Sequence, residues 1–434
     1  VVSWETSSIK TTGFTAVTGT GYFCNTTGGA FTVTLPLSPS AGDVVGVSDY
    51  AKTWDTDNLT LGRNGSNIGG GADDAILDTE GLAVTLVYVD GTKGWIVTDS
   101  GLQGDAPTEL FVAATGGCIT TSGNYKMHTF LSPNTFVVTC GGNSAGSNTV
   151  DYLVVAGGGG GGQGNNASGG AGGAGGLRFA ASTFCAPVTS SPRAGSTVPV
   201  TATPYAITVG GGSARSPHSS CGAAGGGDGS ASVFSTITST GGGGGGSFQS
   251  PVMNGRAGGS GGGGAGDNGG PAPTTGGSST PVTSPIQGYA GGSGYSTNPY
   301  PGGGGGGAGA IGQSLVNPNP GGFGGAGLQV NIDLNTHYYG GGGGGSVWES
   351  ANGGDGGKGG GGGGGGKCCS GGAGGGCAVT TGGAGIANWP TQANGGDGGD
   401  NTGGGGGGNN KSPPGSVLNS AGGSGIVIIR YKYQ

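Results

Sequence analysis

The sequence predicts an all-β protein whose later part carries a long glycine-rich insertion. Three observations lead to this class. Short runs that alternate apolar and polar residues recur between residues 1 and 155, and none has a helical period. Glycine makes up 120 of the 434 residues, much of it in unbroken runs between residues 156 and 425. A plain apolar strand, Ile426–Tyr433, follows the last of these runs.

Residues 1–100 are predicted to form an N-terminal β domain that serves attachment or oligomerisation. Val84–Val89 alternates as a half-buried strand does. Asp90-Gly91 follows it and Trp95–Val97 comes soon after, which predicts a hairpin because the tight turn requires positive φ. The first stretch, Val1–Lys10, is more exposed in character and is expected to be an arm.

A linker, residues 101–107, leads to a second, sandwich-like β domain formed by residues 108–155 with 426–434. Its predicted strands before the insertion are Gly117–Thr120, Lys126–Phe130, Thr135–Cys140 and Asp151–Val155. An isolated strand as apolar as Ile426–Tyr433 would aggregate, so it needs a partner. Tyr152–Val155 is nearest to it in composition, and we expect these two strands to pair. The two ends of the insertion then lie side by side.

Residues 156–425 are predicted to form a bundle of polyglycine-II helices joined by aromatic and polar loops. Glycine disfavours an α-helix by roughly 1 kcal/mol per residue relative to alanine, and the runs lack the strict triplet of collagen. Extended threefold helices without Cβ atoms can approach closely and hydrogen-bond sideways through their backbones. A disordered or silk-like tract is the alternative. Blocks of similar length recur at 157–162, 241–246, 302–307, 340–345 and 403–408.

The composition argues against several classes of function. The formal net charge is −7 and only 8% of residues are charged, with no basic run, so nucleic-acid binding is not expected. A membrane-spanning helix needs about 18 consecutive apolar residues, and no stretch of the sequence is that long, so no membrane insertion is expected. The 8 cysteines and 3 histidines show no metal-ligand spacing, so neither a metal nor a cofactor is predicted.

Cys118 and Cys140 are a candidate disulfide. They end two predicted strands of one small β unit, at a separation that a meander can close. A bridge needs Cα atoms about 4.4–6.8 Å apart. It also suits a protein that works outside the cell. Two buried free thiols are the equal alternative.

No catalytic residue is predicted, and the chain is not expected to be an enzyme. Glycoside hydrolysis needs paired carboxylates. Asp73-Asp74 lie in an apparent loop, and Asp397 and Asp400 lie among glycines, so each is more simply a solvated turn residue. Matches to G-x-G-x-x-G are numerous, but the composition forces them and no βαβ context surrounds them.

Any specific binding must use side chains of the inserts, because the glycine runs have no side chains. Aromatic rings stack on sugar faces and add contact area at low entropic cost. An alternative role is that these rings cap the bundle ends and shield the backbone from water. The candidate ligand-binding residues are Tyr289, Tyr295, Tyr300, Tyr338, Tyr339, Trp348 and Trp389.

The residues at the two ends of the insertion carry a family resemblance. Tyr152–Ala156 running into polyglycine, together with Gly425–Lys432, resembles glycine-rich tail-fibre and adhesin proteins of tailed bacteriophages. With Gly42–Val45 and Gly62–Ser66 upstream, the chain is similar to fibres of phages that infect aquatic bacteria, cyanobacteria especially. In related adhesins, glycine-rich motifs pack as polyglycine-II helices and the loops between them bind the host receptor. The resemblance implies the same arrangement here.

The resemblance also implies partners and a location. Fibres of this kind are usually homotrimers that join other virion tail proteins and bind a bacterial cell-surface glycan or outer-membrane protein. The implied function is a structural tail fibre or adhesin of the virion tail. A subunit of a non-viral extracellular bacterial fibril, acting in an extracellular filament, is the alternative. A glycan-degrading tailspike ranks third.

Overall fold

The computed structural model describes residues 2–102, 109–164, 167–180, 194–215, 225–248, 253–266, 274–315, 320–349, 351–367, 369–387, 393–410 and 419–434. Within these ranges the chain forms strands, turns and extended segments and no residue is helical, so the all-β class is confirmed. The same ranges contain no helix with the length and apolarity that a bilayer crossing requires.

The chain divides into two compact units, an N-terminal unit, Val1–Thr108, and a C-terminal unit, Glu109–Gln434. The predicted linker, residues 101–107, begins within the last strand of the first unit, which extends to Leu102. The other residues of that linker, 103–107, lie outside the described residues.

The N-terminal unit contains two sheets around one core that includes Trp54 and Trp95. The hairpin predicted at Asp90-Gly91 is confirmed, because the flanking strands β8 and β9 pair antiparallel. Val1–Lys10 is not an arm, because most of it is a strand that pairs in parallel with β3. The first sheet runs β1 (Ser3–Lys10), β3 (Thr20–Cys24), β5 (Val44–Asp49), β8 (Leu82–Asp90) and β9 (Gly94–Leu102); the second runs β2 (Phe14–Thr15), β4 (Phe31–Thr34), β6 (Leu59–Gly62) and β7 (Ala75–Leu77).

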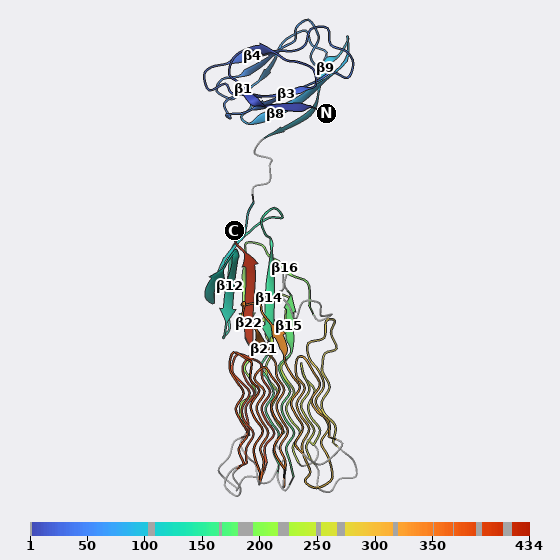
Figure 1. The fold of residues 1–434 in the computed structure, drawn as a ribbon, viewed down its shortest axis with the longest axis vertical. Helices are drawn as coiled ribbons and strands as arrows, with labels where there is room; N and C mark the ends of the chain where they lie inside the picture. Colours follow the sequence, from blue (N-terminus) through green and yellow to red (C-terminus); the bar gives the residue numbers. More distant parts are fainter. Residues whose placement is uncertain are drawn as a thin grey trace. The chain divides into compact units, whose positions relative to one another are not determined.

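The C-terminal unit has two larger sheets and a short hairpin at one end of its glycine-rich segments (Figure 1). One sheet runs β10 (Val112–Thr115), β13 (Asn134–Gly141), β17 (Pro204–Thr208), β18 (Ser232–Phe234) and β19 (Ile237–Ser239). The other runs β11 (Cys118–Ser122), β12 (Tyr125–Phe130), β22 (Ile426–Lys432), β14 (Thr149–Val155) and β15 (Leu177–Ala180), with β16 (Val198–Pro199) on β14. The hairpin is β20 (Leu328–Val330) with β21 (His337–Tyr339).

The predicted pairing of the last strand is confirmed. β14 and β22 pair antiparallel, with Val155 opposite Ile426 and Asp151 opposite Arg430. The two ends of the glycine-rich insertion therefore start from neighbouring strands. Side chains of both larger sheets share one buried core that includes Phe136 of β13 and Tyr431 of β22.

The insertion also supplies part of that core. The predicted boundary at residue 156 had assigned all of the insertion to the glycine-rich bundle. β17 pairs with β13, and β18 pairs in turn with β17. Ile207 and Phe234, which come from these strands, are buried with Phe136. β18 and β19 are two short strands joined by a turn at Ser235, whose φ is +52°.

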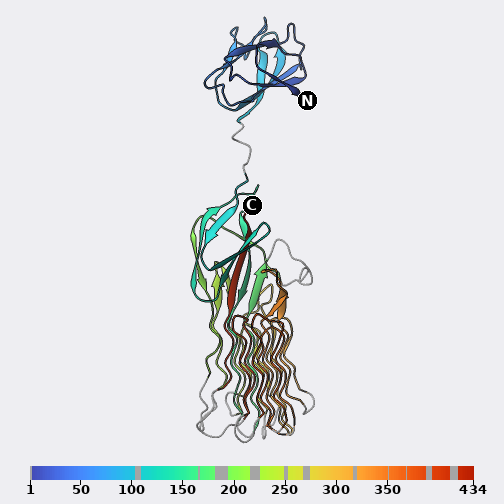
Figure 2. The same ribbon diagram turned by 60° about the vertical axis from the view of Figure 1, so that its left-hand side comes forward.

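The glycine-rich segments run alongside one another, away from β14, β15 and β22, to the far end of the unit (Figures 1 and 2). Successive backbone N–H groups donate to different neighbouring segments, and the same neighbouring segment is reached again after three residues. The N–H groups of Gly157, Gly158 and Gly159 donate to Ser230, Gly423 and Gly173, respectively. The next three, Gly160 to Gly162, donate to Gly227, Ser420 and Gly170 on the same three neighbouring segments. One segment is thus bonded on several sides at once.

Because His128 is buried, we expect the stability of the C-terminal unit to fall in acid. Its Nδ1 lies 2.7 Å from the carbonyl of Gly116, so Nδ1–H donates there, and its Nε2 accepts from the Tyr431 hydroxyl at 3.0 Å. Burial lowers the pKa of His128 from 6.5, against the opposing effect of the Gly116 bond and with the help of the Lys126 charge. The unfolded chain therefore binds more protons below pH 6.5, and stability falls as pH drops through that value.

Urea unfolding of the wild type and of His128→Gln between pH 7.5 and pH 5 checks this expectation. The wild-type free energy of unfolding should drop over this range. The glutamine variant should be less stable than the wild type at neutral pH, and its free energy of unfolding should fall less on acidification. Equal pH slopes for both proteins would contradict the assignment.

Candidate functional site

Two glycine-rich segments carry aromatic residues to the far end of the C-terminal unit. Residues 288–294 begin beside the strands, where the carbonyl of Gln287 accepts a 2.8 Å hydrogen bond from β15, and they lead to Tyr295. Residues 340–347 begin directly after β21 and lead to Trp348. Because an extended chain spans up to about 3.3 Å per residue, segments of this length reach roughly 20 Å from the strands.

The ends of these segments are joined by hydrogen bonds. The Trp348 N–H donates to the Pro299 carbonyl at 3.3 Å. Next to this bond, Asn298 Nδ2 donates to Glu349 Oε2 at 2.8 Å. The loop that follows Tyr295 and the end of the second segment therefore form one surface. We call the following residues the far-end cluster: Tyr295, Asn298, Tyr300, Trp348, Glu349 and Lys367.

The far-end cluster combines aromatic rings with both signs of charge. Lys367 Nζ lies 3.9 Å from the centroid of the Trp348 ring, a cation–π contact of about 0.5–1 kcal/mol at exposed sites. Tyr295, Tyr300 and Trp348 are each half-buried, so part of each side chain faces solvent. Rings for stacking, with an amide, a carboxylate and an ammonium group beside them, suit a polar uncharged ligand such as a sugar.

The other candidate aromatics lie elsewhere. Tyr289 is half-buried near the strands, where its N–H donates to the Gly307 carbonyl. Tyr338 and Tyr339 belong to β21, beside the strands. Tyr339 is fully buried in a core with Leu153, and burial raises the pKa of its hydroxyl, so it is a core residue and presents no ring to a ligand. Trp389 lies outside the described residues.

The structure corrects the disulfide prediction. Cys118 is an exposed free thiol on β11, and Cys140 is a half-buried free thiol on β13. β11 and β13 belong to different sheets, so the meander that would have brought the two sulfurs together is not formed. Within the described part of the chain, no group of three or more His, Cys, Asp or Glu side chains is placed to hold a metal ion.

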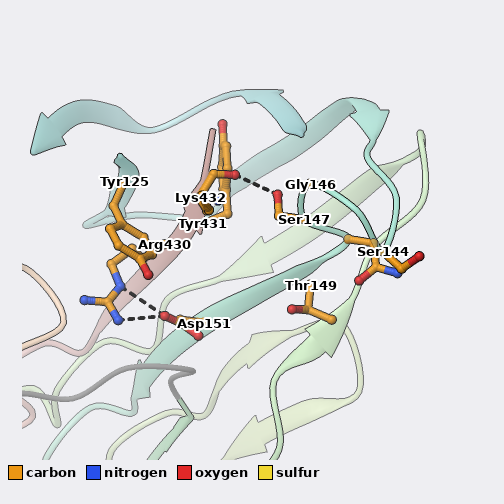
Figure 3. A pocket seen from close by; sticks show the side chains of 10 residues that line it. Tyr125, Ser144, Gly146, Ser147, Thr149, Asp151, Arg430, Tyr431 and Lys432 are labelled. Atoms are coloured by element: carbon orange, nitrogen blue, oxygen red, sulfur yellow. Dashed lines mark hydrogen bonds and ion pairs between the residues drawn. The ribbon is translucent and has the colours of Figure 1, made fainter. Parts of the chain in front are cut away.

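A second candidate site is a polar pocket of about 250 Å³ in the strands of the C-terminal unit (Figure 3). Asp151 and Arg430 form an ion pair in it, with hydrogen bonds of 2.7 and 3.0 Å to one carboxylate oxygen. Both side chains are 4% exposed, and the Tyr125 ring lies 4.8 Å from the guanidinium carbon. Ser147 Oγ donates to the Lys432 carbonyl at 2.7 Å.

This ion pair was not among the residues predicted from the sequence. The signal was present, because Asp151 and Arg430 are opposite charges in two mostly apolar strands that were expected to pair. Antiparallel pairing with Val155 opposite Ile426 places them directly across from each other. The composition of the two strands predicts that they pair, but it does not predict the register that places these two charges side by side.

Comparison with known protein families gives one match. The model of a glycine-rich domain family matches residues 131–388, which is more than half of the chain. This range takes in most of the glycine-rich segments together with β14 and the strands of the insertion. No curated protein matches the chain.

Proposed function

This chain belongs to the glycine-rich domain family, and we propose that it acts as a structural tail fibre or adhesin of a virion that binds a bacterial surface receptor. The observation that carries the proposal is the separation of backbone from side chains. Glycine-rich segments form the body of the C-terminal unit, and a mixed aromatic and polar surface lies where they end. The resemblance of both ends of the insertion to phage tail fibres points the same way.

The glycine-rich segments are, in this proposal, polyglycine-II helices packed side by side. A helix with three residues per turn points successive N–H groups about 120° apart. The three-residue recurrence of partners along Gly157–Gly162 has this property. Most glycines of the segments have no room for a Cβ, which also fits such close packing. An experimental structure with pleated strands through residues 241–246 would contradict the helices.

Receptor binding is assigned to the far-end cluster and to the loops around it. Most residues of the segments are glycines bonded through their backbones, so the aromatic side chains that could recognise a ligand lie outside the glycine runs, in the inserts at their ends. The proposed receptor is a cell-surface glycan or an outer-membrane protein. The remaining parts of the proposal, a homotrimer joined to other tail proteins and located in the virion tail, follow the resemblance.

A subunit of a non-viral extracellular fibril is the second candidate. An N-terminal arm that pairs with the next subunit would have favoured it. The first stretch is instead β1, which pairs within its own sheet. We therefore place the adhesin first.

Adsorption to cells tests the proposed function. Tyr295→Ala combined with Trp348→Ala should lower the binding of the labelled, purified chain to aquatic bacteria, cyanobacteria included. Loss of about 1.4 kcal/mol of stacking corresponds to tenfold weaker binding. Tyr338→Ala, at the strand end of the same segments, is the matched control and should adsorb as the wild type does. Unchanged adsorption of the folded double variant would remove the far-end cluster from the binding site.

A further inference from the structure

We propose that the N-terminal unit carries a separate binding site for one neutral sugar residue, with Trp4 as its stacking platform. The site lies on the outer face of the first sheet, which we define as the face opposite the core. This proposal does not rest on the function assigned to the far-end cluster.

The strand register builds the outer face. Successive side chains of a strand point to opposite faces of the sheet. One row of directly opposed residues crosses all five strands and leads from the aromatic ring to a carboxylate: Trp4, Gly21, Gly46, Thr85 and Asp99. The neighbouring row is Phe23, Ser48, Ala83 and Gly101. Residues that alternate with these rows, such as Val45 and Leu86, are buried in the core.

Two glycines let the Trp4 ring lie against the sheet. A Cβ on Gly21 would stand 2.7 Å from two ring atoms, and a Cβ on Gly46 would stand 3.3 Å from the far edge of the ring. Phe23 packs at the side, with a centroid distance of 5.2 Å. Trp4 is nevertheless 39% exposed. The ring is thus held in one position with part of its surface open, as a stacking platform requires.

A pocket of about 280 Å³ adjoins the ring. Its polar side chains on the outer face are the hydroxyl groups of Ser48 and Thr85 and the carboxylate of Asp99. Sites for drug-sized ligands have volumes of about 300–1,000 Å³, so this pocket suits a single ring rather than a larger molecule. No lysine, arginine or histidine is among the described residues that line it.

These features select a neutral sugar. A sugar ring has one C–H face that stacks on an aromatic side chain, and its hydroxyls pair with serine, threonine and carboxylate oxygens. An anionic sugar would meet Asp99 without a compensating cation, so acidic glycans are disfavoured. The same face could instead be covered by a second copy of the chain, and the experiment separates these outcomes.

The test uses the purified full-length chain and four immobilised polysaccharides: laminarin, mannan and galactan as neutral probes and alginate as the acidic one. We expect the wild type to bind at least one neutral probe and not alginate. Trp4→Ala should weaken that binding at least tenfold, and Trp4→Phe should weaken it less. Ala83→Arg, which fills the pocket and leaves Trp4 in place, should also weaken it at least tenfold.

Two controls keep the result interpretable. Leu37→Ala and Ile76→Ala each remove an exposed apolar side chain of the N-terminal unit that lies outside the pocket lining. Both should bind the neutral probe as the wild type does. The proposal is overturned if no neutral probe binds, or if folded Ala83→Arg binds normally. It is equally overturned if Ala83→Arg converts an oligomer into monomers, because the face is then an interface between copies.

Discussion

Replacing Gly172 with alanine is expected to destabilise the glycine-rich part by about 3 kcal/mol or more. The Gly172 N–H donates to Gly406 at 2.8 Å, and its carbonyl accepts from Gly343 at 3.0 Å. A Cβ at this position would overlap the carbonyl oxygen of Gly159. Overpacking alone costs about 1–3 kcal/mol, and each broken backbone bond adds about 1 kcal/mol. The measurement is chemical unfolding followed by circular dichroism.

A matched control lies in another segment of the same unit. Gly211 is exposed, and a Cβ there would meet nothing within 4 Å. Its φ does not lie in the left-handed region. Gly211→Ala should therefore leave stability unchanged or raise it by about 0.4–1 kcal/mol through the unfolded chain. Equal effects of the two substitutions would show that close packing does not hold the segments together.

Replacing Arg430 with methionine is expected to cost about 3–5 kcal/mol of unfolding free energy. The change leaves Asp151 buried without the guanidinium that now bonds to it twice. It also removes the cation from the Tyr125 ring. The double variant Arg430→Met with Asp151→Leu should recover much of the loss, because it removes the uncompensated charge.

The exposed pair of Arg256 and Asp228 is the control for this experiment. These side chains are 54% and 38% exposed. Solvent screens such a pair, so Arg256→Met should change stability by about 0–1 kcal/mol. If Arg430→Met proved as mild as Arg256→Met, burial of the first pair would not matter to the fold.

Part of the fold could be predicted because an apolar strand must be buried against a partner strand. Tyr152–Val155 and the last strand each need a buried partner, and their shared composition indicated the pairing that β14 and β22 make. The hairpin between β8 and β9 followed from Asp90-Gly91, since its turn chemistry is local.

Other features depend on contacts between distant residues. Tyr205–Val209 has the apolar pattern of a strand, but only the pairing of β17 with β13 shows that it completes the core of the two larger sheets. Val1–Lys10 reads as an exposed arm because its sequence is polar apart from a few side chains. Its Trp4 gains a fixed position only from Gly21 and Gly46, which belong to two other strands.

The candidate binding residues divide in the same way. The sequence identified aromatic side chains in the inserts, and the N–H groups of Tyr295 and Trp348 both donate to carbonyls of one loop, those of Pro301 and Pro299. It could not separate them from Tyr339, which is buried beside the strands. Whether an insert lies at the strand end or the far end depends on which segments precede it and in which direction each one runs.

Local sequence patterns were enough to predict the all-β class, the two strands that close the insertion and the chemical character of its inserts. Which glycine run lies beside which, and hence which side chains share a surface, is seen only in the folded chain. The physical reason is that glycine runs are alike. Each offers the same N–H and C=O groups and no side chain, so local sequence cannot specify a neighbour. The strands and inserts at their ends must select it.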